Sequence, residues 1–222
     1  MAKIKSKWVC QSCGYEAPAY LGKCPECSSW GTFVEEAETI SKVQPQHENK
    51  TFFENNIQKI NDITIDETFR FSTGLEEFDR VLGGGLVEGS LVLIAGDPGI
   101  GKSTLVLQTV MNIRDKKILY CSGEESSYQL KLRALRLSEQ PDEEHENVFI
   151  ACETNLDDIF VHVANVEPDI VIIDSIQTIA TDDLESSAGS VGQVRECAAR
   201  ILKFAKESGT PVILIGHITK EG

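Results

Sequence analysis

Beyond residue 90 of the chain, short apolar runs alternate with stretches in which apolar side chains recur every three or four residues. The apolar runs predict buried strands, and the i, i+3, i+4, i+7 spacing from Leu156 to Val163 predicts a helix with one buried face. We expect strands at residues 90–95, 117–122, 147–152, 169–174 and 211–218, and helices at 127–137, 156–166 and 193–206. This alternation predicts an α/β fold with a mainly parallel sheet and helices on both faces.

A phosphate-loop pattern, G-x-x-x-x-G-K-[ST], lies between the first of these strands and a further helical pattern. Its glycines would let backbone N–H groups surround phosphate oxygens, while Lys102 reaches the terminal phosphates and Ser103 binds Mg²⁺. A chance glycine turn is the alternative, but strand, loop and helix follow one another in the required order. We therefore expect an ATP and Mg²⁺ site on the following residues: Gly96, Asp97, Pro98, Gly99, Ile100, Gly101, Lys102, Ser103 and Thr104.

Polar residues follow three later strands, at the edge where parallel strands would present them to a nucleotide. Asp174 ends an apolar run and is expected to hold Mg²⁺, usually through water. Glu124 could polarise the attacking water, and we prefer it to Glu125, which would then start the next helix. Both glutamates could instead be ordinary acids of a helix N-terminus. His217 could sense the γ-phosphate, although a histidine at a strand end is more often structural.

Four cysteines near the N-terminus form two C-x-x-C pairs separated by ten residues. Two such pairs can complete a tetrahedron of thiolates around Zn²⁺, and the alternative is a redox-active or incidental set. About thirty residues cannot bury enough surface to fold alone, so the metal would stabilise this module. The expected zinc ligands are Cys10, Cys13, Cys24 and Cys27, and small core positions are expected for Cys121, Cys152 and Cys197.

The 222 residues, of which 41% are hydrophobic, suit one full-sized domain with a smaller module. We expect a zinc-binding module at residues 1–34, a polar linker at 35–66 and an ATPase core at 67–222. No apolar run is long enough to span a membrane, and no apolar stretch follows the N-terminal lysines as in a signal peptide. The expected location is therefore the cytoplasm.

The formal net charge of −14 argues against a broad basic face for nucleic acid. The charge is uneven, because residues 1–34 hold four lysines and two glutamates, a balance of +2, which leaves −16 on the remainder. Any DNA contact should therefore be local, through a loop or the bore of a ring.

Together these motifs resemble the bacterial RadA/Sms family, RecA-like ATPases of recombination and DNA repair. Besides the cysteine module, the resemblance is carried by Ser72-Thr73-Gly74, Leu82-Gly83-Gly84-Gly85, the phosphate loop, Ser122-Gly123-Glu124-Glu125-Ser126, Ile172-Ile173-Asp174-Ser175 and Gly216-His217-Ile218-Thr219-Lys220-Glu221-Gly222. It implies a RecA-like core in which Lys102 and Ser103 handle phosphates and Mg²⁺, and Asp174 holds the same Mg²⁺. It also implies that Glu124 activates water and that His217 senses the γ-phosphate.

Members of this family form hexameric rings on single-stranded DNA and drive branch migration of recombination intermediates beside a RecA-type recombinase. The resemblance implies these partners here, with a DNA-contacting loop that starts near Lys220. The family continues with a Lys-Asn-Arg-Phe-Gly motif and a domain similar to that of the Lon protease. This sequence stops at Gly222, so we expect it to be part of a longer protein.

Two other classes of protein fit some of these motifs. Regulatory ATPases of the KaiC type share the phosphate loop and the upstream glycines, and would use nucleotide binding as a slow switch. The zinc module favours the RadA interpretation over this one. Alternatively, the zinc module could be the functional part, a docking unit on a nucleotide-stabilised scaffold.

Overall fold

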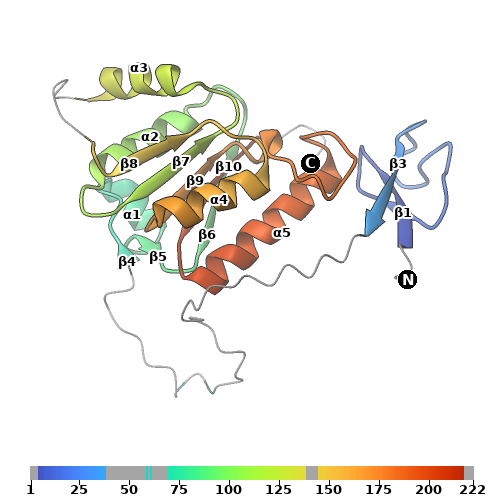
Figure 1. Cartoon of the computed structure of the whole chain (residues 1–222), viewed down its shortest axis with the longest axis horizontal. Helices are drawn as coiled ribbons and strands as arrows, with labels where there is room; N and C mark the ends of the chain where they lie inside the picture. Colours follow the sequence, from blue (N-terminus) through green and yellow to red (C-terminus); the bar gives the residue numbers. More distant parts are fainter. Residues whose placement is uncertain (1–4, 39–58, 60, 62–69, 139–144, 218–222) are drawn as a thin grey trace.

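The structure is a computed structural model that describes residues 5–38, 59, 61, 70–138 and 145–217. These residues form an α/β core and a small zinc ribbon, which here means residues 5–38 (Figure 1). Most of the expected linker, and the expected DNA-contacting loop near Lys220, lie outside the described residues. No helix among the described residues is both long and apolar enough to cross a membrane.

Five parallel strands form the central sheet, in the order β6-β10-β9-β7-β8. Their bounds are Leu91–Gly96 for β6, Ile118–Ser122 for β7, Val148–Ala151 for β8, Ile170–Asp174 for β9 and Val212–His217 for β10. The register pairs His217 with Gly96, and Asp174 with Ser122. The carboxyl ends of four strands therefore meet at one edge of the sheet, where each strand delivers a residue of the expected site.

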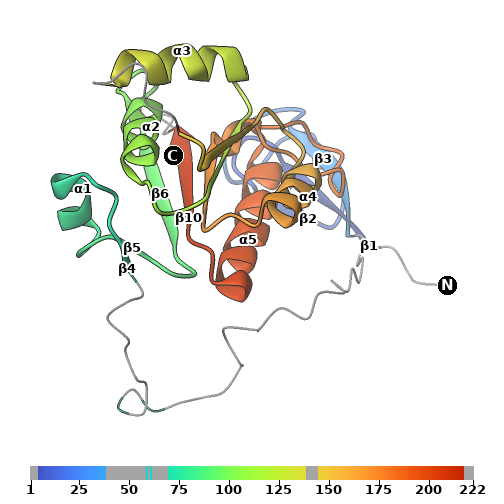
Figure 2. The same ribbon diagram turned by 60° about the vertical axis from the view of Figure 1, so that its left-hand side comes forward.

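Two pairs of helices cover the sheet, one on each face (Figures 1 and 2). Helices α2 (Lys102–Asn112) and α3 (Ser127–Leu137) pack against one face, and α4 (Leu156–Val166) and α5 (Val191–Ser208) against the other. Alternate strand residues point to opposite faces, so Tyr120 and Ile172 join the α2 face whereas Cys121 and Ile173 join the α5 face. Each fully buried Ile or Leu in these layers contributes roughly 1.5–3 kcal/mol. The α/β class is confirmed.

The helix ends follow from local capping. In α3 the side chain of Ser126 accepts a hydrogen bond from the Gln129 N–H in a capping box, and Asn155 caps α4 in a similar way. Both helices have the predicted bounds. Helix α5 is longer than predicted at both ends, because Ser190 caps it at the start and Gly209, with φ 77°, ends it.

A short hairpin and helix precede the phosphate-loop strand. Strands β4 (Arg70–Phe71) and β5 (Leu86–Val87) pair on either side of helix α1 (Glu76–Val81). Gly85 has φ +121°, and a Cβ there would lie 2.3 Å from the carbonyl oxygen of Phe71. Only glycine fits such a close backbone approach, which explains the glycine at this position.

Asp79 fastens the Ser72-Thr73-Gly74 segment to α1. Its carboxylate accepts hydrogen bonds from Ser72 Oγ at 2.6 Å, Thr73 N at 2.8 Å and Thr73 Oγ1 at 2.6 Å. Burial raises the pKa of Asp79, but these hydrogen bonds outweigh it and hold the pKa below its ordinary 3.8. The segment is therefore held by a charged acceptor.

We expect Asp79→Asn to lower the free energy of unfolding by about 2 kcal/mol near neutral pH, because a charged acceptor of three bonds is lost. A lowered folded-state pKa stabilises the fold above the unfolded pKa and ceases to do so as pH falls through the folded value. The difference from the wild type should therefore shrink below pH 3.8. Urea unfolding followed by circular dichroism measures it. Glu77→Gln, which removes only an exposed ion pair with Arg80, is the matched control, and an equal loss in both variants would contradict the prediction.

The zinc ribbon is a three-stranded antiparallel sheet in the order β2-β1-β3. Its strands are β1 (Lys5–Cys10), β2 (Glu16–Ala17) and β3 (Phe33–Glu38). The ribbon meets the start of α5, where Glu16 Oε1 lies 3.7 Å from Arg195 Nη1 (Figure 1). Its buried core is small and consists of Cys10, Ala17, Cys24 and Phe33, with Trp8 packed against it.

Candidate nucleotide and zinc sites

The phosphate loop joins β6 to α2 and turns sharply at two glycines. Gly99 and Gly101 have φ 81° and 97°, a region of backbone conformation that residues other than glycine rarely adopt. Gly101 is the N-cap of α2. Backbone N–H groups at such a helix start favour an anion. Lys102 begins the helix with only 6% of its surface exposed, and its Nζ donates to the carbonyl oxygens of Gly96 and Asp97, both at 2.9 Å. The lysine thus lies folded over its own loop.

Three of the expected site residues form a continuous line at the sheet edge. Nζ of Lys102 lies 3.1 Å from Nδ1 of His217, and Nε2 of His217 lies 3.5 Å from Oε1 of Glu124. An ammonium group can only donate, so Nδ1 of His217 accepts, and the ring proton of a neutral imidazole is then on Nε2, toward Glu124. The hydroxyl of Ser175 donates to the same Glu124 oxygen at 2.9 Å. The phosphate loop, β7, β9 and β10 are therefore linked side chain to side chain.

The two neighbouring glutamates lie in different surroundings. Glu125 forms an ion pair with Arg133, and its N–H donates to Ser122 Oγ at 3.0 Å. Helix α3 begins only at Ser127 and has no acid in its first turn. The interpretation of both residues as N-terminal acids is therefore wrong, and so is the placement of Glu125 at the helix start. The glutamate that faces His217 is Glu124, whose side chain is 52% exposed.

A close contact between chain segments fixes the backbone beside Glu124. A Cβ at Gly123 would lie 2.0 Å from Oγ1 of Thr178, which belongs to the short 3-10 helix η3 (Ile176–Thr178). The N–H of Gly123 also donates to the carbonyl oxygen of Asp174 at 2.9 Å. The end of β7 is thus held against the segment that follows β9, which brings Glu124 near Ser175.

Asp174 ends β9 and is only 6% exposed. The hydroxyl of Tyr120 donates to its Oδ2 at 2.6 Å. Burial, followed by the negative charge of Asp174, raises the pKa of Tyr120 far above its ordinary value, so the phenol keeps its proton and remains a donor. Tyr120 belongs to the α2 face, so the Asp174 side chain lies on that face of the sheet too. The half-buried Ser103, at the start of α2, is on the same side. A hydroxyl and a carboxylate are oxygen ligands of the kind that Mg²⁺ prefers.

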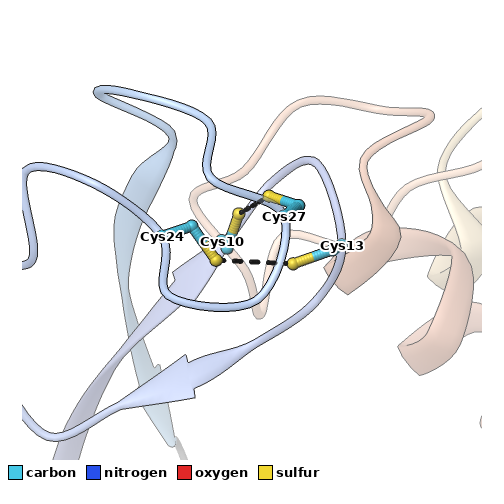
Figure 3. A group of neighbouring side chains, drawn as sticks. All are labelled: Cys10, Cys13, Cys24 and Cys27. Atoms are coloured by element: carbon cyan, nitrogen blue, oxygen red, sulfur yellow. Dashed lines mark hydrogen bonds between the residues drawn. The ribbon is translucent and has the colours of Figure 1, made fainter.

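The four cysteines of the two C-x-x-C pairs come together at one end of the ribbon, with their sulfurs pointing toward one another (Figure 3). All four Sγ atoms lie within 4.8 Å of one another, with 3.7 Å between Cys10 and Cys27 and 3.6 Å between Cys13 and Cys24. Zinc–sulfur bonds of about 2.3 Å in a tetrahedron would place the sulfurs about 3.8 Å apart. The cluster is therefore a four-cysteine zinc site, and the expected ligand set is the one brought together.

The protonation of these thiols is uneven. Burial raises the pKa of Cys10, but hydrogen bonds, first from Thr32, lower it to about 6. For Cys13, a backbone hydrogen bond at Tyr15 lowers the pKa, but burial and the neighbouring sulfurs raise it to about 12. Four adjacent thiolates repel one another, and a bound cation removes that repulsion. Outside the cluster, Cys121 and Cys197 are buried as predicted, whereas Cys152 is exposed at the end of the edge strand β8.

Comparison with known proteins identifies both parts of the molecule. A family model described as an AAA domain matches residues 59–222, so the chain belongs to this family of phosphate-loop ATPases. A second model, described as a rubredoxin metal binding domain, matches residues 8–35. The chain is a homologue of proteins named DNA repair protein RadA, and the resemblance found in its motifs is confirmed.

Three such relatives show the extent of the similarity. The identity is 48% over 229 residues for the protein of Bacillus subtilis, 46% over 226 residues for that of Listeria monocytogenes and 43% over 226 residues for that of Pseudomonas aeruginosa. Each alignment covers 100% of this chain and 48% of the relative. The chain thus spans about half the length of the curated relatives that it matches.

Proposed function

We propose that this chain carries the ATPase core of a DNA-dependent motor that acts in recombinational DNA repair in the cytoplasm. The observation that supports it best is the line from Lys102 through His217 to Glu124, which connects a phosphate loop to a carboxylate able to accept a proton. The similarity to proteins named for DNA repair points to DNA as the partner. We keep the division into a zinc module (1–34), a linker (35–66) and the core (67–222), with the correction that β3 carries the module to Glu38 and the linker begins after it.

In the proposed mechanism, Lys102 leaves the carbonyl oxygens of its own loop and binds the terminal phosphates of ATP. Bound Mg²⁺ would neutralise charge on the phosphate oxygens, with Ser103 and Asp174 as the residues that hold it. Glu124 accepts the proton of the attacking water while the bond to the leaving ADP breaks. His217, released by Lys102, is then free to contact the γ-phosphate and to report its presence to Glu124.

The remaining part of the proposal concerns partners. We propose single-stranded and branched DNA as substrates, branch migration of recombination intermediates as the process, and a RecA-type recombinase as a partner. We also propose assembly into a hexameric ring, in which several acidic cores would surround DNA through local loops. These properties are proposed for a whole protein of the relatives' length, of which this chain spans about half.

Steady-state ATP hydrolysis, with and without single-stranded DNA, tests this function. We expect Lys102→Ala to reduce turnover by about 10²–10³-fold, because a buried cation that stabilises transferring phosphate is lost. Lys131→Ala, which removes an exposed lysine from α3, should leave turnover unchanged. Absence of ATP binding would contradict the proposal. ATP binding without stimulation by DNA would favour a slow nucleotide switch of the KaiC type, and the same assay on a longer chain would separate that switch from a motor lacking other parts.

A further inference from the structure

We propose that Tyr120 is a positioning residue of the magnesium site, and that it acts by fixing the orientation of the Asp174 carboxylate. This inference rests on the proposed function, since it assigns a role in the binding of Mg²⁺ and nucleotide. The role is separate from those of the residues that would touch the ligands. It predicts that a tyrosine in the middle of a core strand controls how much Mg²⁺ the site requires.

The sheet register brings the two side chains together. In the pairing of β7 with β9, Tyr120 lies opposite Ile172 and Ser122 lies opposite Asp174. Residues two apart on a strand point to the same face, so Tyr120 and Asp174 are diagonal neighbours on the α2 face. Their 2.6 Å separation from oxygen to oxygen is that of a charge-assisted hydrogen bond. Both residues are shielded from solvent, since Tyr120 is 0% and Asp174 only 6% exposed.

Packing alone does not explain the tyrosine. Its core cluster contains apolar side chains from the helices that cover it, among them Val106, Val110 and Leu130. A phenylalanine would fill this space, whereas a buried hydroxyl costs free energy unless it is hydrogen-bonded. The partner of this hydroxyl is the carboxylate at the edge of the nucleotide site. The hydrogen bond engages Oδ2 and so fixes the orientation of the carboxylate, which would hold Mg²⁺ through water.

Outer partners of this kind orient a metal-binding carboxylate, and their loss typically weakens metal binding by about 10–100-fold. We expect the lower end of this range here, because Asp174 would hold Mg²⁺ through water. Nucleotide binding without the metal should be unaffected, because it depends on Lys102. The side chain of Lys102 contacts Gly96 and His217 and not Tyr120. The signature is therefore a change in Mg²⁺ requirement at constant metal-free affinity.

The test is the affinity of the whole chain for a slowly hydrolysed fluorescent ATP analogue, titrated with Mg²⁺ and also measured in excess chelator. Tyr120→Phe should raise the Mg²⁺ concentration at half-maximal binding by about tenfold and leave the affinity in chelator unchanged. Thr109→Val is the matched control, because it also removes a fully buried hydroxyl, but one that donates to the carbonyl oxygen of Leu105 within α2 and not to Asp174. It should leave the Mg²⁺ requirement at the wild-type value.

A double-mutant cycle separates positioning from general loosening of the core. In an Asp174→Asn background, Tyr120→Phe should change the Mg²⁺ requirement by less than about twofold, because the group through which it acts is already altered. An unchanged requirement in Tyr120→Phe alone, or an equal effect in both backgrounds, would overturn the inference. Failure of the wild type to bind the analogue with Mg²⁺ would overturn the proposed function itself, so the two failures are distinguishable.

Discussion

Replacing Cys24 by serine should abolish zinc binding and unfold the zinc ribbon while the α/β core stays folded. Cys24 is fully buried, and its Sγ lies 3.6 Å from that of Cys13 within the cluster. Apart from the cysteines, the buried apolar residues of the ribbon are Val9, Ala17 and Phe33, which are too few to hold it together without metal. Structural zinc contributes about 10–16 kcal/mol to such modules, so losing one ligand removes most of the free energy of folding.

Two measurements check this prediction independently. Metal analysis should show zinc falling from about one ion per chain to nearly none. Tryptophan fluorescence reports the ribbon alone, because the two tryptophans of the chain, Trp8 and Trp30, both belong to it. Trp8 packs against the ribbon core and forms an edge contact with Tyr20 at 5.1 Å between ring centroids, so its emission should shift to the red when the ribbon unfolds. Circular dichroism of the core should change little.

Cys152→Ser is the matched control, because this cysteine is exposed and lies outside the cluster. It should retain both zinc and the native fluorescence. A Cys24→Ser protein with a full complement of zinc would refute the ligand assignment. Unfolding of the core along with the ribbon would show instead that the contact between Glu16 and Arg195 couples the two parts. Loss of partner binding with hydrolysis intact would identify the ribbon as a docking unit.

Local patterns were sufficient to predict the core. Strands such as β9 are apolar at nearly every position because both faces are covered, and the helices carry their caps, such as Ser126 and Asn155, in the sequence itself. Helix α5 was predicted two residues short at its start, because Val191 and Gly192 precede the apolar face and only the cap at Ser190 marks the beginning. The strand β3 was not predicted, since its sequence is acidic after Phe33 and Val34 and the strand is defined by its pairing with β1.

The candidate site was predictable where its chemistry lies in one short segment. The phosphate loop and the two C-x-x-C pairs are of this kind, because spacing along the chain fixes their geometry. Tyr120 and Ser175 were missed, because their partners Asp174 and Glu124 lie 54 and 51 residues away and are reached only across neighbouring strands. A tyrosine within an apolar run is read as a core residue, and the only signal was its hydroxyl in a strand that ends at the site.

Replacing Glu124 by glutamine should reduce ATP hydrolysis by about 10²–10⁴-fold, the range expected when a general base is lost. Glutamine keeps the shape and can still accept the hydrogen bond that Ser175 donates at 2.9 Å, but it cannot take a proton from water. ATP affinity should stay the same or rise slightly, because a negative charge near the phosphates is removed. Single-turnover hydrolysis of bound ATP, measured beside the equilibrium affinity, separates these two effects.

Glu125→Gln is the closest available control, since it makes the same chemical change one residue away. Glu125 is paired with Arg133, so its substitution should cost about 1 kcal/mol of stability and change turnover by less than about twofold. If the Glu125 variant were inactive and the Glu124 variant active, the assignment of the general base to Glu124 would be wrong. A Glu124 variant that lost affinity and turnover by the same factor would act in binding rather than in proton transfer. The contact of Glu124 with His217, which itself contacts Lys102, favours a loss of hydrolysis without a loss of affinity in the Glu124 variant, because it couples this carboxylate to the residue proposed to hold the phosphates.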